Sequence, residues 1–151
     1  MVSRFWGKYA DRTSFTNMIR KCLLVLGLSY LFAACAIPTN GKIMFALYYG
    51  FHGMALGGIN SALINLVFDY VSAEKRSDSL AICQAASGLA GFAATLAASP
   101  LIAYIQKNSN RLLGIPLYAQ QLVSGIAFAV IVITIVYIKF VMSAGKKSPK
   151  P

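Results

Sequence analysis

Four long stretches of the chain contain no Asp, Glu, Lys or Arg. They cover residues 22–41, 43–68, 79–106 and 112–138. A helix needs about 18–20 mainly apolar residues to cross a hydrocarbon core about 30 Å thick. The runs are continuous and do not alternate with a period of two, so they predict helices and not membrane β-strands. The pattern therefore predicts an all-α integral membrane protein with four transmembrane helices in an up-down arrangement.

Turn-forming and charged residues between the runs define the expected boundaries. Pro38-Thr39-Asn40-Gly41 is a turn signal that separates the first two helices. We expect transmembrane helices at 22–38, 43–68, 79–104 and 117–141. A cytoplasmic segment at 1–21, a cytoplasmic loop at 69–78, an external loop at 105–116 and a basic cytoplasmic tail at 142–151 complete the expected organisation.

Composition and charge support this class of protein. The chain has 151 residues, of which 58% are hydrophobic and 12% charged, whereas soluble domains carry about 25% charged residues. This low share of charged residues argues against a soluble enzyme and against a disordered chain. Most of the 14 basic residues lie on the side of the two termini and the 69–78 loop, while Lys42, Lys107 and Arg111 lie on the other side. This asymmetry predicts that both termini are cytoplasmic, and it explains the net charge of +10 by contact with anionic lipid and not with nucleic acid.

Residues that could support catalysis or metal binding form no recognisable set. The sequence contains no Ser/His/Asp arrangement, no metal-ligand spacing and no phosphate-binding glycine loop, so we expect neither an enzyme nor a cofactor. All four acidic residues lie at or outside the expected cytoplasmic boundary: Asp11, Asp69, Glu74 and Asp78. The absence of a mid-membrane carboxylate argues against a complete proton-driven carrier within these residues, and against a small multidrug resistance protein.

The two middle helices carry polar faces, and the first and fourth are almost wholly apolar. On the third helix, at roughly 100° per residue, a sector of about 120° holds Gln84, Ser87, Gly88, Gly91, Thr95, Ala98 and Ser99. Small residues allow another backbone to approach closely, and hydroxyls can bond across helices. The sector predicts either a static helix–helix seam, which the angles alone favour, or a seam that slides during transport.

On the second helix, Tyr49, His52, Leu56 and Asn60 form one stripe, and Asn65 follows one turn later. His52 is the only histidine. It is either satisfied by a neighbouring helix or is a ligand contact or proton carrier in a cavity. The candidate residues of a substrate cavity are Tyr49, His52, Asn60, Asn65, Gln84, Ser87 and Thr95. The apolar first and fourth helices are expected to face lipid over much of their surface.

The cytoplasmic segments resemble parts of the major facilitator superfamily. Gly7, Asp11 and Arg12 match the first half of its loop motif, G-x-x-x-D-R/K-x-G-R/K-R/K, while Ser14 and Phe15-Thr16 depart from the second half. The loop at 69–76 and the helix after it resemble the start of the last hairpin in such transporters. The order of plain, polar, polar and plain helices also fits, so nearly the whole chain resembles helices nine to twelve of a twelve-helix transporter.

The resemblance implies a fragment of a secondary active transporter that moves a small solute by alternating access. Its partners would be the solute, the lipid bilayer and the remaining N-terminal helices of the transporter. It also implies a cytoplasmic latch formed by Gly7, Asp11, Arg12, Asp69, Glu74 and Arg76. Arg12 can pair with Asp69, and Glu74 with Arg76; the alternative is ordinary solvated charge at the membrane surface. We favour Arg12–Asp69 as a real contact, because a short first hairpin brings both residues to one membrane face.

A second hypothesis is a stand-alone four-helix membrane scaffold or subunit with no transport of its own. It would bind partner helices through the Gly/Ala/Ser face of the third helix. A channel-like oligomer has less support, because the chain has no repeated polar ring and no charged constriction. The short loops and the absence of a glycosylation sequon predict a multi-pass protein of a bacterial inner (plasma) membrane.

Overall fold

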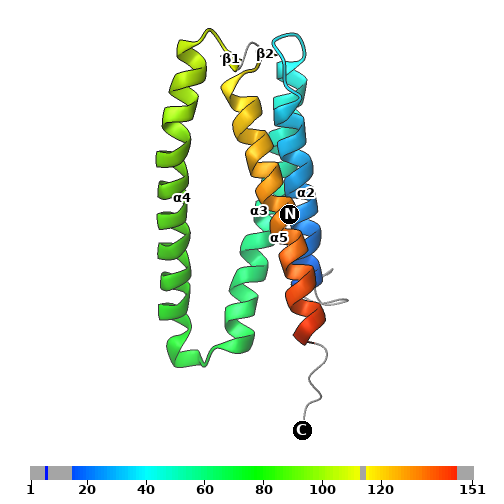
Figure 1. Ribbon diagram of the computed structural model, residues 1–151. Coiled ribbons are helices and arrows are strands. Elements are labelled where there is room, and N and C mark those ends of the chain that lie inside the picture. Colours follow the sequence, from blue (N-terminus) through cyan, green and yellow to red (C-terminus); the bar gives the residue numbers. More distant parts are fainter. Residues whose placement is uncertain (1–5, 7–14, 113–114, 146–151) are drawn as a thin grey trace.

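Helices make up most of the described chain. The computed structural model describes residue 6 and residues 15–112 and 115–145. Its long helices are α2 (Phe15–Ala34), α3 (Gly41–Tyr70), α4 (Arg76–Lys107) and α5 (Ala119–Gly145) (Figure 1). A 3-10 turn, η1 (Ala73–Lys75), joins α3 to α4, and strands β1 (Arg111–Leu112) and β2 (Ile115–Pro116) pair antiparallel before α5. Four helices are long and apolar enough to cross a membrane, which indicates a multi-pass membrane protein.

Successive long helices run in opposite directions (Figure 1). The α2–α3 turn and the β1–β2 strands lie at one end of the molecule, which we call the hairpin end, and η1 lies at the other, the η1 end. The 30 residues of α3 and the 32 residues of α4 correspond to about 45 and 48 Å at 1.5 Å per residue. Both helices are longer than the roughly 30 Å core of a bilayer.

The observed helix boundaries differ from those expected, most of all for the first helix. It covers Phe15–Ala34 and not 22–38, because uncharged runs mark the membrane boundary, whereas a helix can continue through the basic residues outside it. It ends early because the Asn40 side chain accepts a hydrogen bond from the Ile37 N–H (2.8 Å) and donates one to the Cys35 carbonyl (3.5 Å). These two bonds begin the turn at Cys35.

The segment expected as an external loop at 105–116 also contains regular structure. Helix α4 continues to Lys107, and β1 and β2 follow within the same segment. Ser109 and Asn110 have positive φ angles of 55° and 57°, a left-handed conformation that reverses the chain direction. The Leu117 N–H then donates to the Asn110 carbonyl (2.9 Å), so the hairpin closes against the end of α4.

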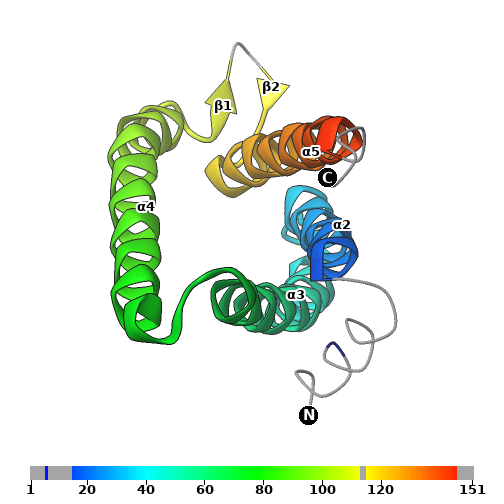
Figure 2. The ribbon, with the colours of Figure 1, turned by 90° about the horizontal axis from the view of Figure 1, so that it is seen from below.

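Helix α2 packs against both α3 and α5 (Figure 2). A Cβ at Gly27 would lie 3.5 Å from the side chains of Phe128 and Ile131, so this glycine brings α5 close to α2. The side-chain amide of Gln121 adds a bond between distant segments, because its Nε2 donates to the Ala36 carbonyl (3.0 Å) while its Oε1 accepts from the Tyr118 N–H (3.2 Å). These contacts make α2 the centre of a three-helix unit.

The buried cluster lies toward the η1 end, between α2 and α3. It consists of Trp6, Met18, Cys22 and Ala62. The indole Nε1 of Trp6 donates to the Met54 carbonyl (3.0 Å). Burial of these side chains shows that one side of α2 packs against α3, while Leu24, Leu28 and Leu31 of the same helix stay exposed. Hydropathy could not show this, since an apolar residue suits lipid and a helix interface equally well.

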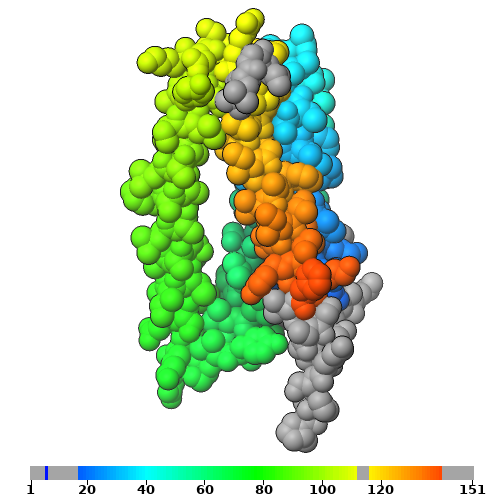
Figure 3. All heavy atoms as spheres, in the orientation of Figure 1, coloured from blue at the N-terminus to red at the C-terminus, as the bar shows by residue number. Residues whose placement is uncertain are grey.

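Helix α4 stands apart from the other three helices. Residues 81–97 are exposed on every side, and 6% of the membrane-span residues of this helix are buried, compared with 28% for α2. A space-filling view shows an open gap between α4 and α5 (Figure 3). Ile105, near the hairpin end, is fully buried. The helix is therefore held near its ends and leaves a long cleft beside it.

Candidate functional site

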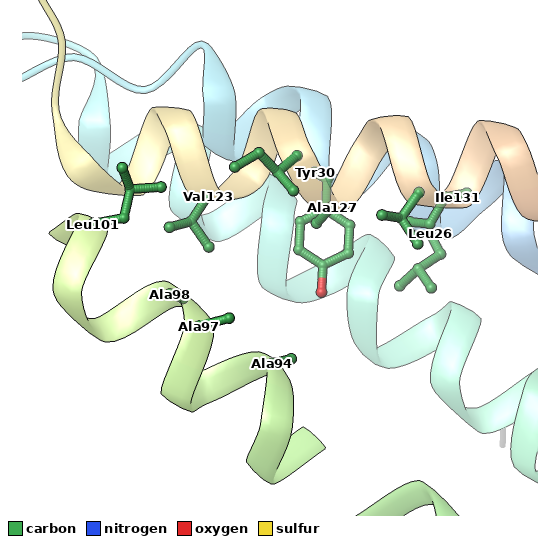
Figure 4. A pocket seen from close by; sticks show the side chains of 11 residues that line it. Leu26, Tyr30, Ala94, Ala97, Ala98, Leu101, Val123, Ala127 and Ile131 are labelled. Atoms are coloured by element: carbon green, nitrogen blue, oxygen red, sulfur yellow. The ribbon is translucent and has the colours of Figure 1, made fainter. Parts of the chain in front are cut away.

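The cleft contains a cavity of about 510 Å³, which we call the apolar cavity. Leu26 and Tyr30 line it from α2, Ala94 and Ala97 from α4, and Val123 and further aliphatic residues from α5. Ala94 and Ala97 point from α4 toward Tyr30 (Figure 4). Because alanine side chains are short, they leave space between α4 and the larger aliphatic side chains of α5. Apart from the Tyr30 hydroxyl, the side chains around this cavity are hydrocarbon.

A second cavity, of about 650 Å³, lies at the hairpin end and is called here the polar cavity. All four long helices contribute to it, and it shares Tyr30 and Val123 with the apolar cavity. Its polar side chains come mainly from tyrosines and amides: Tyr48, Tyr49, Tyr118, Gln106, Asn110 and Gln120. None of the described side chains that line it carries a charge.

Aromatic rings pack closely where α2 and α3 meet beside the polar cavity. His52 lies edge-on to Tyr30 (ring centroids 5.6 Å apart, 89° between planes) and 5.1 Å from Tyr48. The rings of Tyr48 and Tyr49 are 4.9 Å apart. His52 Nδ1 is buried and has no hydrogen-bond partner among the described residues. The ring cluster therefore holds Tyr30 and Tyr48 at the cavity wall.

The structure separates the candidates on the second helix. Tyr49 lines the polar cavity, whereas His52 lies behind Tyr30 and Tyr48 and lines neither cavity. Asn60 is exposed on α3, and Asn65 donates to the Ser61 carbonyl of its own helix (2.8 Å). Of these four residues, the structure brings only Tyr49 to a cavity.

The predicted polar face of the third helix does not face the cleft. Gln84, Ser87 and Thr95 are exposed on α4. The Ser87 hydroxyl donates to the Cys83 carbonyl (2.8 Å) and that of Thr95 to the Gly91 carbonyl (2.9 Å). Of the residues predicted to form the seam, only Ala98 lines the apolar cavity. Within the described chain, the predicted seam has no opposing helix.

Sequence reasoning missed most of the polar cavity. Tyr30, Tyr48, Gln106 and Tyr118 were not among the candidates, although they line it. Tyrosine and amide residues occur where the uncharged runs at 79–106 and 112–138 end and begin. These residues are therefore expected near the same membrane face, and this was the feature of the sequence that could have indicated the polar cavity.

The predicted latch is only partly described. Gly7, Asp11 and Arg12 lie outside the described residues, so the Arg12–Asp69 pair stays a prediction. Asp69 and Glu74 are exposed near the η1 end.

Among the described residues, no ion pair joins Glu74 to Arg76. The Arg76 guanidinium instead donates from Nε to the Val71 carbonyl (3.1 Å) and from Nη2 to the Phe68 carbonyl (2.9 Å), and it lies 5.1 Å from the centre of the Phe68 ring. The last carbonyls of α3 lack helical partners and carry partial negative charge, so they attract this cation. Arg76 therefore caps α3.

Comparison of the chain with models of known families, with characterised proteins and with solved structures finds no match.

Proposed function

We propose that the chain is part of a secondary active transporter of the major facilitator type, which moves a small solute across a membrane by alternating access. The proposal rests on the resemblance of the sequence motifs and on one structural observation: α4 is separated from the other helices while its polar sector stays exposed. In the complete transporter, this sector meets further helices of the same protein.

The chemistry of the exposed sector supports a helix partner. Gln84, Ser87 and Thr95 lie within the uncharged run at 79–106, which is long enough to cross a bilayer. Polar side chains in contact with lipid tails are unfavourable, and in membrane proteins they usually face other helices or a cavity. The serine and threonine hydroxyls are satisfied by their own helix, but the Gln84 amide has no bond to any described residue. An additional helix would provide such a bond.

The membrane arrangement belongs to the same proposal. The excess of Lys and Arg on the side of η1 supports the proposal that both termini are cytoplasmic. The hairpin end, with the polar cavity, then faces outward. A bacterial inner membrane is the proposed location.

The test compares two double variants of α4 in the source membrane. S87L/T95L alters the polar sector, while the control A86L/A93L adds the same side chain on other faces of the same helix. We expect the first variant to lower recovery of the chain with its partner helices and to lower solute uptake by proteoliposomes, and the control to retain both.

Equal recovery and uptake for the two double variants would contradict the proposal, because the polar sector would then face only lipid. A different result would instead favour the membrane scaffold: S87L/T95L loses its association with partner helices, and the unaltered protein takes up no charged or uncharged solute. The exposed face of α4 is the observation that supports this second function, because a scaffold would bind its partner helices through the same face.

A further inference from the structure

We propose that the apolar and polar cavities form one binding site for a single-chain amphiphile with an uncharged, hydroxyl-bearing head group. This inference names the substrate class of the transporter and rests on the function proposed above. The head would occupy the polar cavity at the hairpin end, and the alkyl chain would lie in the apolar cavity between α4 and α5.

The two cavities adjoin each other. Tyr30 and Val123 line both of them, so the polar part and the apolar part meet at these two side chains. The polar part is lined by Gln106, Asn110 and Tyr118 at the hairpin end, and the apolar part is lined by residues farther along α4 and α5, such as Ala94 and Ile131 (Figure 4). A ligand that fills both must therefore have one polar end and one apolar end.

The apolar cavity suits an alkyl chain. Ala94, Ala97 and Ala98 form its α4 wall, and the opposite wall consists of branched aliphatic side chains. Burial of each methylene group of a ligand there lowers the free energy of binding, and among the described lining side chains only the Tyr30 hydroxyl is a polar group that would lose water. The gap between α4 and α5 also leaves the cleft open (Figure 3), so a chain can enter from the lipid.

The polar cavity selects for an uncharged head group. Tyrosine hydroxyls and side-chain amides both donate and accept hydrogen bonds, as ligand hydroxyls do. The side-chain amides of Gln106 and Gln120 line the cavity, and neither is bonded to a described residue, so both are available to a ligand. A charged head would lose hydration without gaining a described counter-charge among the lining residues, which disfavours its binding.

Three probes with the same ten-carbon chain length test this selectivity: monodecanoylglycerol, decanoate and decyltrimethylammonium. Saturable binding is measured by equilibrium dialysis of the whole chain in lipid nanodiscs, and binding to empty nanodiscs is subtracted. We expect monodecanoylglycerol to bind about tenfold or more tightly than either ion. Free glycerol, which has the head without the chain, should not bind saturably.

Two matched variants locate the site. A94F fills the apolar cavity and should weaken monodecanoylglycerol binding about tenfold or more. A93F places the same ring on the neighbouring residue, which does not line the cavity, and should leave binding unchanged. Q106L should weaken monodecanoylglycerol binding about threefold to tenfold, because one hydrogen bond to the head is lost.

The proposal is overturned if either ion binds as tightly as monodecanoylglycerol, if A94F and A93F bind it equally, or if no probe binds saturably. Binding to the chain in nanodiscs requires neither transport nor a partner helix. A failure of this experiment is therefore distinct from a failure of the uptake and recovery tests on S87L/T95L, which address the transporter itself.

Discussion

The contact of Gly58 in α3 with Cys22 in α2 predicts a large effect from one methyl group. At Gly58, a Cβ would overlap the Cys22 sulfur of α2 and would lie 3.0 Å from Nε1 and 3.1 Å from Cδ1 of Trp6. Cys22 is completely buried, so its sulfur has little room to move. The substitution G58A therefore forces α2 and α3 apart or displaces Trp6 from its bond to the Met54 carbonyl.

The magnitude follows from two opposing effects. Replacing glycine by alanine in a helix stabilises it by about 1 kcal/mol, whereas overpacking a tight contact costs about 1–3 kcal/mol. Since the overlap involves a buried sulfur, we place G58A near the upper part of that cost, with a net destabilisation of about 1–2 kcal/mol. Gly53 lies in the same helix with nothing within 4 Å of its Cβ position. G53A should therefore stabilise the protein by about 0.5–1 kcal/mol.

The assay is reversible unfolding in mixed micelles of dodecyl maltoside and dodecyl sulfate. Trp6 is the only tryptophan and lies at the contact, so its fluorescence reports the α2–α3 packing while circular dichroism reports total helix. The variant C22A removes the overlapping sulfur, and in that background G58A should lose most of its cost. If G58A and G53A unfold at the same dodecyl sulfate fraction, the reasoning about this contact is refuted.

Three further changes test other contacts by the same unfolding assay. R76L should destabilise the protein by about 1–2 kcal/mol, because it removes two hydrogen bonds to the end of α3. E74Q should change stability by less than about 0.5 kcal/mol. If E74Q lost as much stability as R76L, the two side chains would form an ion pair. Q121L should cost about 1–2 kcal/mol, because it removes the bond to the Ala36 carbonyl that joins α5 to the α2–α3 turn and the bond from the Tyr118 N–H at the start of α5. Q120L, beside it and exposed, should cost little. N40A should cost about 1 kcal/mol because the turn loses both of its side-chain bonds, and an unchanged midpoint would contradict that role.

The sequence alone determined the number of long helices and their approximate positions. Uncharged runs predict transmembrane helices because the free energy of transferring a residue from water to hydrocarbon depends mainly on that residue's own side chain. The same property explains why the predicted boundaries failed at Phe15 and Cys35. Helix ends depend on local hydrogen bonds, such as those of Asn40, and these bonds do not follow hydropathy.

Only the tertiary structure decided how the helices are arranged. Apolar α2 lies at the centre of the packing, because Gly27 contacts α5 and Gly58 of α3 lies beside Cys22. Polar α4 stands apart, with a long cleft beside it. Such pairings depend on shape complementarity between residues far apart in the chain, and polarity along the sequence contains no information about it. For the same reason, Tyr30 and Gln106 form one polar cavity that no single helix pattern predicts.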